Sequence, residues 1–542
     1  MQPNRYFGDA SPAPSFISFR TSSAMYRSLT LTLLLLLTAC LLGSTMATAE
    51  ENLATIPAIV INPTVGPPTT KVSVSGIGFD PYAAVDIYFD TTDLALAVTN
   101  GAGAFGVGSI RGGIAIQVPA SAVPGTHWIT AVERYGIKAA QKPFTVRTDW
   151  AQFHFSPDHK GVNPYENILS PANVGGMGLD WSYQTGGPIN FSSPTVASGV
   201  VYFGTIYSDD SVYALNASTG ALLWRYAAGG QVFSPAVANG VLYIGGDGLH
   251  ALNATTGALL WKYTAIYVES SPAVADGVVY FVAYPYGESV VYALNASSGA
   301  FLWQYITSEF GIQSSPAVAN GVVYVGSEGD HNLYALNATT GALLWKYTTG
   351  SLVLSSPAVA NGVVYFGCDD DNVYALNAST GALLWKYTTG SYYVDSSPAV
   401  VNGVVYVGAR DHNVYALNAT TGALLWKYTT GDGIYSSPAV GDGVVYVGSN
   451  DGNLYALNAS DGALLWKYTT GILYASSPAV ANGVVYVGSY DGNLYAFDLT
   501  GDLLCRSVSP PERPDPSLLQ PDWSLQPSTL VTNSLQQFAS TK

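Results

Sequence analysis

Carboxylates, histidines, thiols and amides are the side chains of this sequence that carry chemistry, and their spacing decides which reactions they favour. The acids gather in short Asp-rich segments such as Asp369-Asp370-Asp371, Asp451-Gly452 and Asp491-Gly492. Such segments are typical of tight turns, because an Asp side chain caps its own backbone and glycine tolerates a positive φ. We therefore interpret these acids as turn residues rather than as general bases or metal ligands.

The histidines and cysteines form no recognisable ligand set. The histidines are His127, His154, His159, His250, His331 and His412. Of these, only His154 and His159 are spaced to act together, and we interpret all six as ordinary polar histidines. The three cysteines, Cys40, Cys368 and Cys505, offer neither a CxxC pair nor a disulfide framework. We predict no catalytic residue, no metal site and no bound cofactor.

Seven segments of the form Asn-Ala-Ser/Thr match the acceptor sequence for N-glycosylation. Their asparagines are Asn216, Asn253, Asn295, Asn337, Asn377, Asn418 and Asn458. Asp498 takes the same place in an eighth, degenerate copy, and turn capping explains both residue types. Glycosylation remains open for a host that glycosylates exported proteins.

Composition excludes some classes of protein. The 542 residues carry a formal charge of −16 and only 10% charged residues, with 57 glycines and 30 prolines. A nucleic-acid-binding protein needs a basic surface, which this composition cannot provide. Few charges with many glycines favour short strands joined by tight turns.

The N-terminal segment 1–49 has the features of an export signal. Arg20 and Arg27 precede an apolar run over 29–42, and Ala47-Thr48-Ala49 offers a cleavage site. Leu37-Thr38-Ala39-Cys40 also resembles a lipobox, which would make Cys40 a lipid anchor. We favour secretion, keep lipidation as the alternative, and expect no membrane span in the mature chain, because the run is shorter than about 20 residues.

A repeat of about 40 residues dominates the chain. A Ser-Pro step recurs eight times, at Pro194, Pro235, Pro272, Pro316, Pro357, Pro398, Pro438 and Pro478. A second motif, Ala-Leu-Asn-Ala-x-x-Gly-Ala-x-Leu-Trp, recurs seven times and ends at Trp224, Trp261, Trp303, Trp345, Trp385, Trp426 and Trp466. A degenerate eighth copy ends at Cys505. Four short apolar runs per repeat predict an all-β protein with an eight-bladed β-propeller over 148–505.

The repeats also predict how the ring closes. In the fifth repeat the strands are expected at 355–359, 363–367, 373–376 and 382–387, with a hairpin turn at Asn361-Gly362. We interpret the tryptophans as docking residues between blades, because each buries a large apolar area. Trp181 supplies the tryptophan that is missing at Cys505, so we predict that 179–183 completes the last blade.

Two further parts flank the propeller. Residues 57–147 alternate as half-buried strands and resemble the immunoglobulin-like modules of bacterial surface proteins, through Gly76-Ile77-Gly78-Phe79-Asp80-Pro81 and Gly125-Thr126-His127-Trp128. The resemblance implies a small β-sandwich that acts as a spacer or adhesive module. Residues 506–542 are rich in Pro, Ser and Gln, a composition typical of disorder.

The repeats, with Trp150 and the lead-in segment 161–174, resemble the pyrroloquinoline-quinone-like propeller repeat family. That family includes quinoprotein alcohol dehydrogenases and the propeller lipoprotein of outer-membrane assembly. The resemblance to the enzymes implies a quinone, Ca²⁺, an Asp base and a vicinal disulfide. This chain has no adjacent cysteines, so we favour a non-catalytic binding scaffold and keep a quinoprotein oxidoreductase or an envelope assembly scaffold as alternatives.

Comparison of the repeats with one another points to one face. Variation concentrates before each Ser-Pro step, where aliphatic residues such as Ile434 and Leu473 stand beside aromatic ones, and in the turn between the second and third strands, as in Arg410-Asp411-His412. Alternating strand direction places both segments on the same face, rimmed by Tyr, Phe, Leu and Ile. The candidate binding residues are Phe233, Tyr267, Phe310, Leu352, Tyr392, Tyr393, Tyr435 and Tyr474. We predict a monomer that binds a protein or glycan there.

Overall fold

The computed structural model describes residues 56–107, 113–207, 209–264, 267–285, 287–308, 314–390 and 392–499. The export signal, Cys505 and the tail 506–542 therefore lie outside the described residues. Within those ranges the regular secondary structure consists of strands, as the sequence predicts, and one short 3₁₀ helix, η1 (Val174–Gly176). None of the helices among the described residues has the length and apolar character needed to cross a bilayer.

Residues 58–146 form two sheets that share one core. The strands are β1 (Ala58–Asn62), β2 (Val65–Gly66), β3 (Lys71–Ile77), β4 (Ala84–Phe89), β5 (Thr92–Val98), β6 (Ile114–Gln117), β7 (Gly125–Glu133) and β8 (Ala139–Val146). One sheet has the order β1-β3-β6 and the other β2-β8-β7-β4-β5. Alternate residues of β1 and β3 are buried and join the inward residues of β4 and β7 in one apolar cluster. This is a β-sandwich, and the resemblance to immunoglobulin-like modules stays a prediction.

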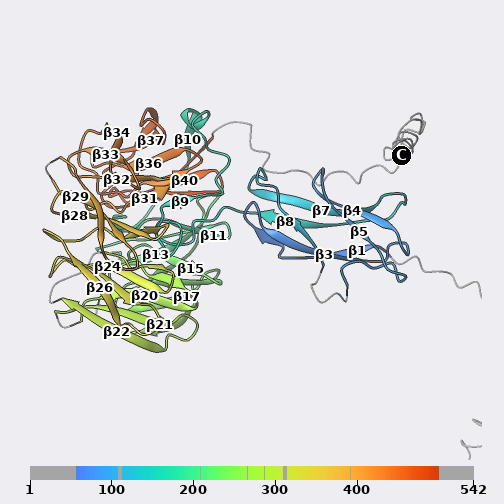
Figure 1. Cartoon of the computed structure of the whole chain (residues 1–542), viewed down its shortest axis with the longest axis horizontal. Helices are drawn as coiled ribbons and strands as arrows, with labels where there is room; N and C mark the ends of the chain where they lie inside the picture. The colour runs from blue at the N-terminus through green and yellow to red at the C-terminus, as the bar shows by residue number, and fades with distance from the viewer. Residues whose placement is uncertain are drawn as a thin grey trace, which may run out of the picture. The chain divides into compact units, whose positions relative to one another are not determined.

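Eight sheets follow one another around the propeller, seven of four strands and one of five (Figure 1). Blade one contains β11 (Thr195–Ala197), β12 (Val200–Gly204), β13 (Ser211–Asn216) and β14 (Leu222–Ala227). Blade two contains β15 (Ala236–Ala238), β16 (Val241–Ile244), β17 (Leu249–Asn253) and β18 (Leu259–Tyr263). Blade three contains β19 (Ala273–Ala275), β20 (Val278–Ala283), β21 (Ser289–Asn295) and β22 (Phe301–Ser308). Blade four contains β23 (Ala317–Ala319), β24 (Val322–Gly326), β25 (Asn332–Asn337) and β26 (Leu343–Thr348).

The remaining blades repeat this plan. Blade five contains β27 (Ala358–Ala360), β28 (Val363–Cys368), β29 (Asn372–Asn377) and β30 (Leu383–Thr388). Blade six contains β31 (Ala399–Val401), β32 (Val404–Gly408), β33 (Asn413–Asn418) and β34 (Leu424–Thr429). Blade seven contains β35 (Ala439–Gly441), β36 (Val444–Gly448), β37 (Asn453–Asn458) and β38 (Leu464–Thr469), with β9 (Val162–Asn163) added to its inner edge. Blade eight contains β39 (Ala479–Ala481), β40 (Val484–Gly488), β41 (Asn493–Leu499) and, as its outer strand, β10 (Met177–Gln184).

The turn chemistry explains why each repeat folds as a blade. Asn361 and Gly362 adopt φ values of 51° and 78°, the conformation that a two-residue hairpin of the right twist requires. The innermost strand β27 begins at Ala358, so the expected strand at 355–359 is wrong at its start. Pro357 and the two serines before it precede the ladder, and Ser356 lines the channel mouth.

The ring closes as the sequence predicts. Strand β10 pairs antiparallel with β41, with a bulge between Leu179 and Trp181, and the same shift precedes Trp224 in blade one. In Figure 1 the teal strand β10 lies beside the orange strands of the last blade. Residues 179–183 therefore reproduce the outer-strand geometry of the other blades and remove the exposed edge.

The tryptophans dock each blade on the next one. The Trp345 indole N–H donates to the Ala378 carbonyl at 3.0 Å, and its ring covers Gly381, where a Cβ would lie 2.7 Å from the ring. Trp181 repeats this contact between blades eight and one, with its indole N–H 3.2 Å from the Ala217 carbonyl and its ring over Gly220. Equivalent hydrogen bonds to backbone carbonyls are donated by the indole N–H groups of Trp224, Trp261, Trp303, Trp385, Trp426 and Trp466.

Candidate binding face at the channel mouth

Backbone bonds settle which loops share a face of the propeller. The Arg410 N–H donates to the Tyr393 carbonyl at 3.0 Å, and the Tyr490 N–H donates to the Ile472 carbonyl at 2.9 Å, so the two variable segments lie together. On the other face the Ala378 N–H donates to the Gly362 carbonyl at 2.9 Å, which joins the two constant turns. The predicted separation of variable and constant loops is confirmed.

A ring of serines lines the channel below the variable loops. The Ser193 N–H donates to Ser234 Oγ of the next blade at 2.8 Å, and the Ser477 N–H returns to Ser193 Oγ at 3.0 Å. Equivalent bonds join blades three to eight in turn. The first serine of the Ser-Ser-Pro step makes a different bond. In blade five, Ser355 Oγ accepts from the Gly367 N–H of the second strand at 3.1 Å. The Ser-Ser-Pro step is thus explained by channel structure.

The opposite end of the channel is crossed by residues 150–163, which we call the channel segment. Trp150 exchanges two backbone bonds with Val196 of blade one. Carbonyls of the channel segment then accept from the innermost strands of blades two, four, five, six and seven, at Val237, Val318, Val359, Val400 and Val440. Blade three is bound by a side chain instead: Gln152 donates to the Val274 carbonyl at 3.1 Å and accepts from its N–H at 2.8 Å. One irregular segment therefore satisfies the inner edges of the ring.

Sequence reasoning missed this role of the channel segment, because the segment has no periodicity and carries turn residues such as Pro157 and Gly161. His154 and His159 belong to it, and both are almost fully buried. Burial lowers the pKa of His154 to about 3, with help from His159, and burial also lowers the pKa of His159 to about 3. Both are therefore neutral packing residues at ordinary pH. Phe153 stacks on His154 and forms part of the floor of the channel mouth.

The candidate binding residues divide into two groups. Tyr267, Tyr392 and Tyr393 are exposed, at 60%, 64% and 43% of their surface. The half-buried members are Phe233, Leu352, Tyr435 and Tyr474. Phe310 lies outside the described residues.

The expectation that isoleucine and leucine rim the face is wrong at two positions. Ile434 and Leu473 are fully buried, and each packs against the glycine that ends the second strand of the preceding blade. A Cβ at Gly408 would lie 2.3 Å from Ile434, and one at Gly448 would lie 2.8 Å from Leu473. Variation between these aliphatic residues reflects packing between blades rather than partner choice.

The channel mouth contains a cluster of charged and aromatic side chains. Arg410 binds Asp395 with its Nη2 at 2.5 Å and its Nε at 2.6 Å. The guanidinium lies between two rings, 4.8 Å from the Tyr393 centroid and 4.6 Å from the Tyr435 centroid. Tyr435 in turn packs on Tyr474 at 4.5 Å. The cavity here has a volume of about 100 Å³ and is bounded by Asp395, Arg410, the aromatic rings and the serine ring.

Asp369 is the second carboxyl of this cluster. It is only 8% exposed, and burial together with the Asp395 carboxyl raises its pKa to about 8. One oxygen of each aspartate has no hydrogen-bond partner, and a neighbouring carboxylate disfavours the ionised form of a buried carboxyl. Comparison of the repeats identified the aromatic residues of the mouth but missed the cluster of Asp369, Asp395 and Arg410. The repeats do mark part of this cluster, because Asp369 and Arg410 occupy the same position, just before the turn aspartate.

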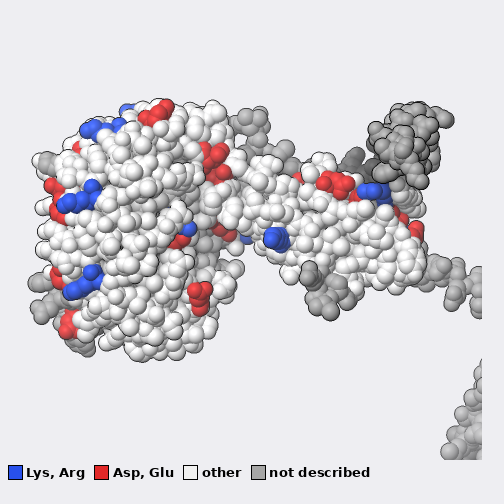
Figure 2. Space-filling model, in the orientation of Figure 1, with Lys and Arg blue, Asp and Glu red and all other residues white. Residues whose placement is uncertain are grey.

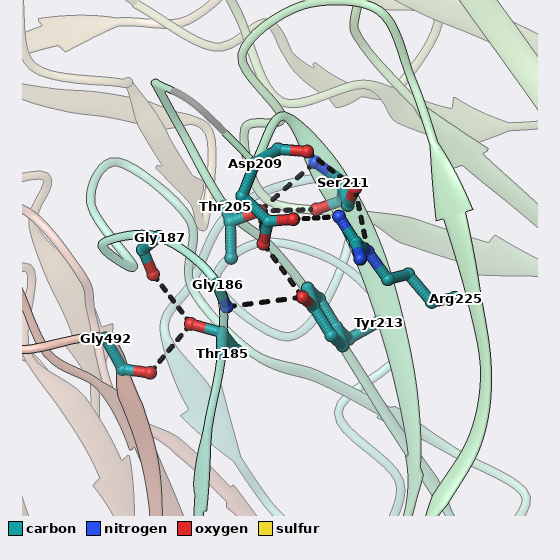
Figure 3. Close-up of polar contacts among 9 residues, drawn as sticks. All are labelled: Thr185, Gly186, Gly187, Thr205, Asp209, Ser211, Tyr213, Arg225 and Gly492. Carbon is teal, nitrogen blue, oxygen red and sulfur yellow. Dashed lines mark hydrogen bonds and ion pairs between the residues drawn. The ribbon is translucent and has the colours of Figure 1, made fainter.

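Most other acids of the propeller turns have structural roles, as the sequence indicates. In blade one, Asp209 accepts from Thr205 and Tyr213 at 2.8 Å and 2.9 Å and pairs with Arg225 (Figure 3). The Tyr213 hydroxyl accepts from the Gly186 N–H across the closing seam. In later blades the turn aspartates accept from the third-strand tyrosines, at Asp370, Asp411, Asp451 and Asp491. These carboxylates stiffen the turns.

The seven asparagines of the glycosylation pattern act as turn caps. Asn377 Oδ1 accepts from the N–H groups of Ser379 and Thr380, both at 3.0 Å, and the other six asparagines make the first of these two bonds.

Charged residues form small, separate groups on the propeller surface shown in Figure 2, so no single-sign field dominates that side.

The raised pKa of Asp369 predicts a pH-dependent stability effect of Asp369→Asn. An acid whose pKa is raised by folding contributes stability below its unfolded pKa, and that contribution is lost as pH rises toward the folded value. The window for Asp369 therefore extends from about pH 4 to about pH 8. We expect the variant to melt roughly 2 °C or more above the unmodified protein near pH 9, with a smaller gain near pH 5. Scanning calorimetry at both pH values tests this, with exposed Asp461→Asn as the control. An equal shift at both pH values would contradict it.

Comparisons with known proteins support the same fold. The profile of the family described as "Outer membrane protein assembly factor BamB" matches residues 208–309, 287–437 and 410–534. A search of curated proteins gives no match. Among solved structures, a europium-containing methanol dehydrogenase is 15% identical, with a TM-score of 0.57, over 65% of this chain and 98% of its own length. The quinohemoprotein alcohol dehydrogenase of Comamonas testosteroni is 17% identical, with a TM-score of 0.56, over 66% and 81%.

BamB of Moraxella catarrhalis is 22% identical, with a TM-score of 0.50, over 60% of this chain and 98% of its own length. At these identities the structural likeness establishes the propeller fold, whereas the sequence profile spans more than half of the chain. The chain therefore belongs to the family of the outer membrane protein assembly factor BamB.

Proposed function

We propose that this protein is a non-catalytic binding scaffold of the cell envelope or cell surface, which docks a protein partner on the channel-mouth face. The observation that carries the proposal is that the exposed Tyr267, Tyr392 and Tyr393 all belong to the variable loops of one face. Tyr267 lines the hollow beside the mouth, and Tyr393 contacts Arg410 of the mouth cluster. Exposed aromatic residues collected on one face are typical of interaction sites. The turns of the other face, by contrast, are nearly identical between blades.

The fold also occurs in dehydrogenases that use a quinone cofactor. Pyrroloquinoline quinone carries three carboxylates, and here it would face Asp395, with Arg410 as the one cation among the described residues that line the cavity. The cavity of about 100 Å³ is small against the roughly 300–1,000 Å³ of small-molecule sites. Among the described residues no three His, Cys, Asp or Glu side chains gather to hold a metal. Cys368 is a lone buried thiol, and burial raises its pKa to about 12. These residues do not fit the cofactor, so we infer a binding role.

The family supplies the remaining support. Its description as an assembly factor points to protein partners in the envelope, and the apolar run over 29–42 favours export. A glycan is the alternative partner, because tyrosine faces also stack on sugars. Oligomeric state and lipidation at Cys40 remain predictions.

We expect Tyr267→Ser with Tyr392→Ser to weaken partner binding about tenfold or more, because exposed aromatic residues dominate interface energies. Both rings are exposed, so the melting temperature should stay nearly unchanged. Tyr435 is unsuitable for this test, because its ring packs on Arg410 and Tyr474. The measurement is cross-linked capture from envelope extracts, repeated after glycosidase treatment. Leu384→Ser, 51% exposed on an outer strand, is the matched control. Equal capture by all three proteins would contradict the proposal.

A further inference from the structure

The channel mouth has more carboxyl groups than its own arginine pairs with. Arg410 is committed to Asp395, whose side chain is only 11% exposed. Asp369 and Asp395 each keep one oxygen without a hydrogen-bond partner. Burial and Asp395 raise the pKa of Asp369, with a smaller contribution from Glu328. Burial, with Glu328, also raises the pKa of Glu269. The carboxyl groups of Asp369, Glu328 and Glu269 therefore lie near one another.

An adjoining hollow shows the same chemistry. It has a volume of about 430 Å³ and shares Phe191 and Phe233 with the mouth cavity. Tyr267, Glu269 and Asp210 complete its walls. Burial raises the pKa of Asp210, with a further contribution from Asp209. Aromatic walls beside carboxyls at partly desolvated positions favour cations, through both charge and ring faces.

We propose that the mouth binds a cationic side chain, lysine or arginine, presented by the protein partner. This inference rests on the proposed function and names its chemistry. Arg410 shows how such a side chain would be held, between Tyr393 and Tyr435 with a carboxylate at its end. The mouth cavity of about 100 Å³ suits one extended side chain rather than a larger ligand.

Binding should be coupled to loss of the Asp369 proton. An incoming cation stabilises the ionised form of Asp369, so affinity for the cation should rise as pH increases toward about 8 and then level off. The groups that face Asp369 are Asp395, Arg410 and Glu328, and Arg410 stays charged throughout this range. Because one proton is released, the affinity can rise by at most about tenfold per pH unit.

The test uses the full chain and three peptides: Gly-Arg-Gly, Gly-Lys-Gly and the neutral isostere Gly-citrulline-Gly. Calorimetric titration at about 0.15 M salt should show binding of the two cationic peptides and about tenfold weaker binding of the citrulline peptide. Asp369→Asn with Asp395→Asn should weaken the cationic peptides about tenfold, whereas Asp461→Asn on the constant face should not. Equal binding of charged and neutral peptides, or an unchanged affinity in the double variant, would overturn the inference.

The pH series needs only the unmodified protein, so it remains decisive if the double variant fails to fold. A flat affinity for Gly-Arg-Gly between about pH 6 and pH 8 would overturn the inference. The outcomes also separate the two proposals. Partner capture that depends on Tyr267 and Tyr392 while cationic peptides fail to bind would reject only the cation site. Cationic peptide binding without tyrosine-dependent capture would reject only the scaffold role.

Discussion

Trp181→Ala is expected to lower the free energy of unfolding of the propeller by about 3 kcal/mol, because truncation of a docked tryptophan removes a large apolar contact. Its indole N–H and the Tyr486 hydroxyl both donate to the Ala217 carbonyl, at 3.2 Å and 3.0 Å. The ring also covers Gly220, and in this position it joins the last blade to the first. The loss therefore falls on the contact that closes the ring.

Denaturant unfolding followed by tryptophan fluorescence measures this effect. Trp385→Ala, which removes an equivalent docking residue in the middle of the ring, should cost a similar amount. Cys505→Ala should leave stability nearly unchanged, because Trp181 already provides the docking contact that the eighth repeat lacks. Equal melting temperatures for the Trp181 and Cys505 variants would show that β10 does not close the ring.

Gln152→Ala is expected to cost about 3 kcal/mol or more, because it leaves both a donor and an acceptor of Val274 unpaired inside the protein. Gln152 is only 8% exposed, and its amide makes both bonds to the innermost strand of blade three. In the neighbouring blades the innermost strand donates at this position to a backbone carbonyl of the channel segment. Blade three therefore depends on one side chain.

Chemical denaturation measures the loss, and hydrogen exchange at the Val274 amide localises it to the inner edge of blade three. Gln231→Ala removes the same side chain from an exposed position and should have little effect on stability. An unchanged exchange rate at Val274 would mean that water replaces the amide, and the channel segment would then contribute less than its bonds indicate.

The sequence by itself determined the ring and its closure. Hairpin turns such as Asn361-Gly362 require a local backbone conformation that the residues themselves favour. Trp181 could be assigned to the last blade because each repeat needs one docking tryptophan and the eighth repeat lacks it. These features are local or periodic, so comparison within one chain reveals them. The aromatic residues of the variable face were found by the same comparison.

Only the tertiary structure decided what those residues meet. The channel segment makes its bonds to strands up to hundreds of residues away, and no spacing in the sequence records that distance. Ile434 and Tyr435 are adjacent in the chain, yet one is buried against Gly408 while the other faces the mouth. Asp369, Asp395 and Arg410 come from the loops of two neighbouring blades. The raised pKa of Asp369 follows from burial and from the nearby Asp395 carboxyl, which meet only once the ring has closed.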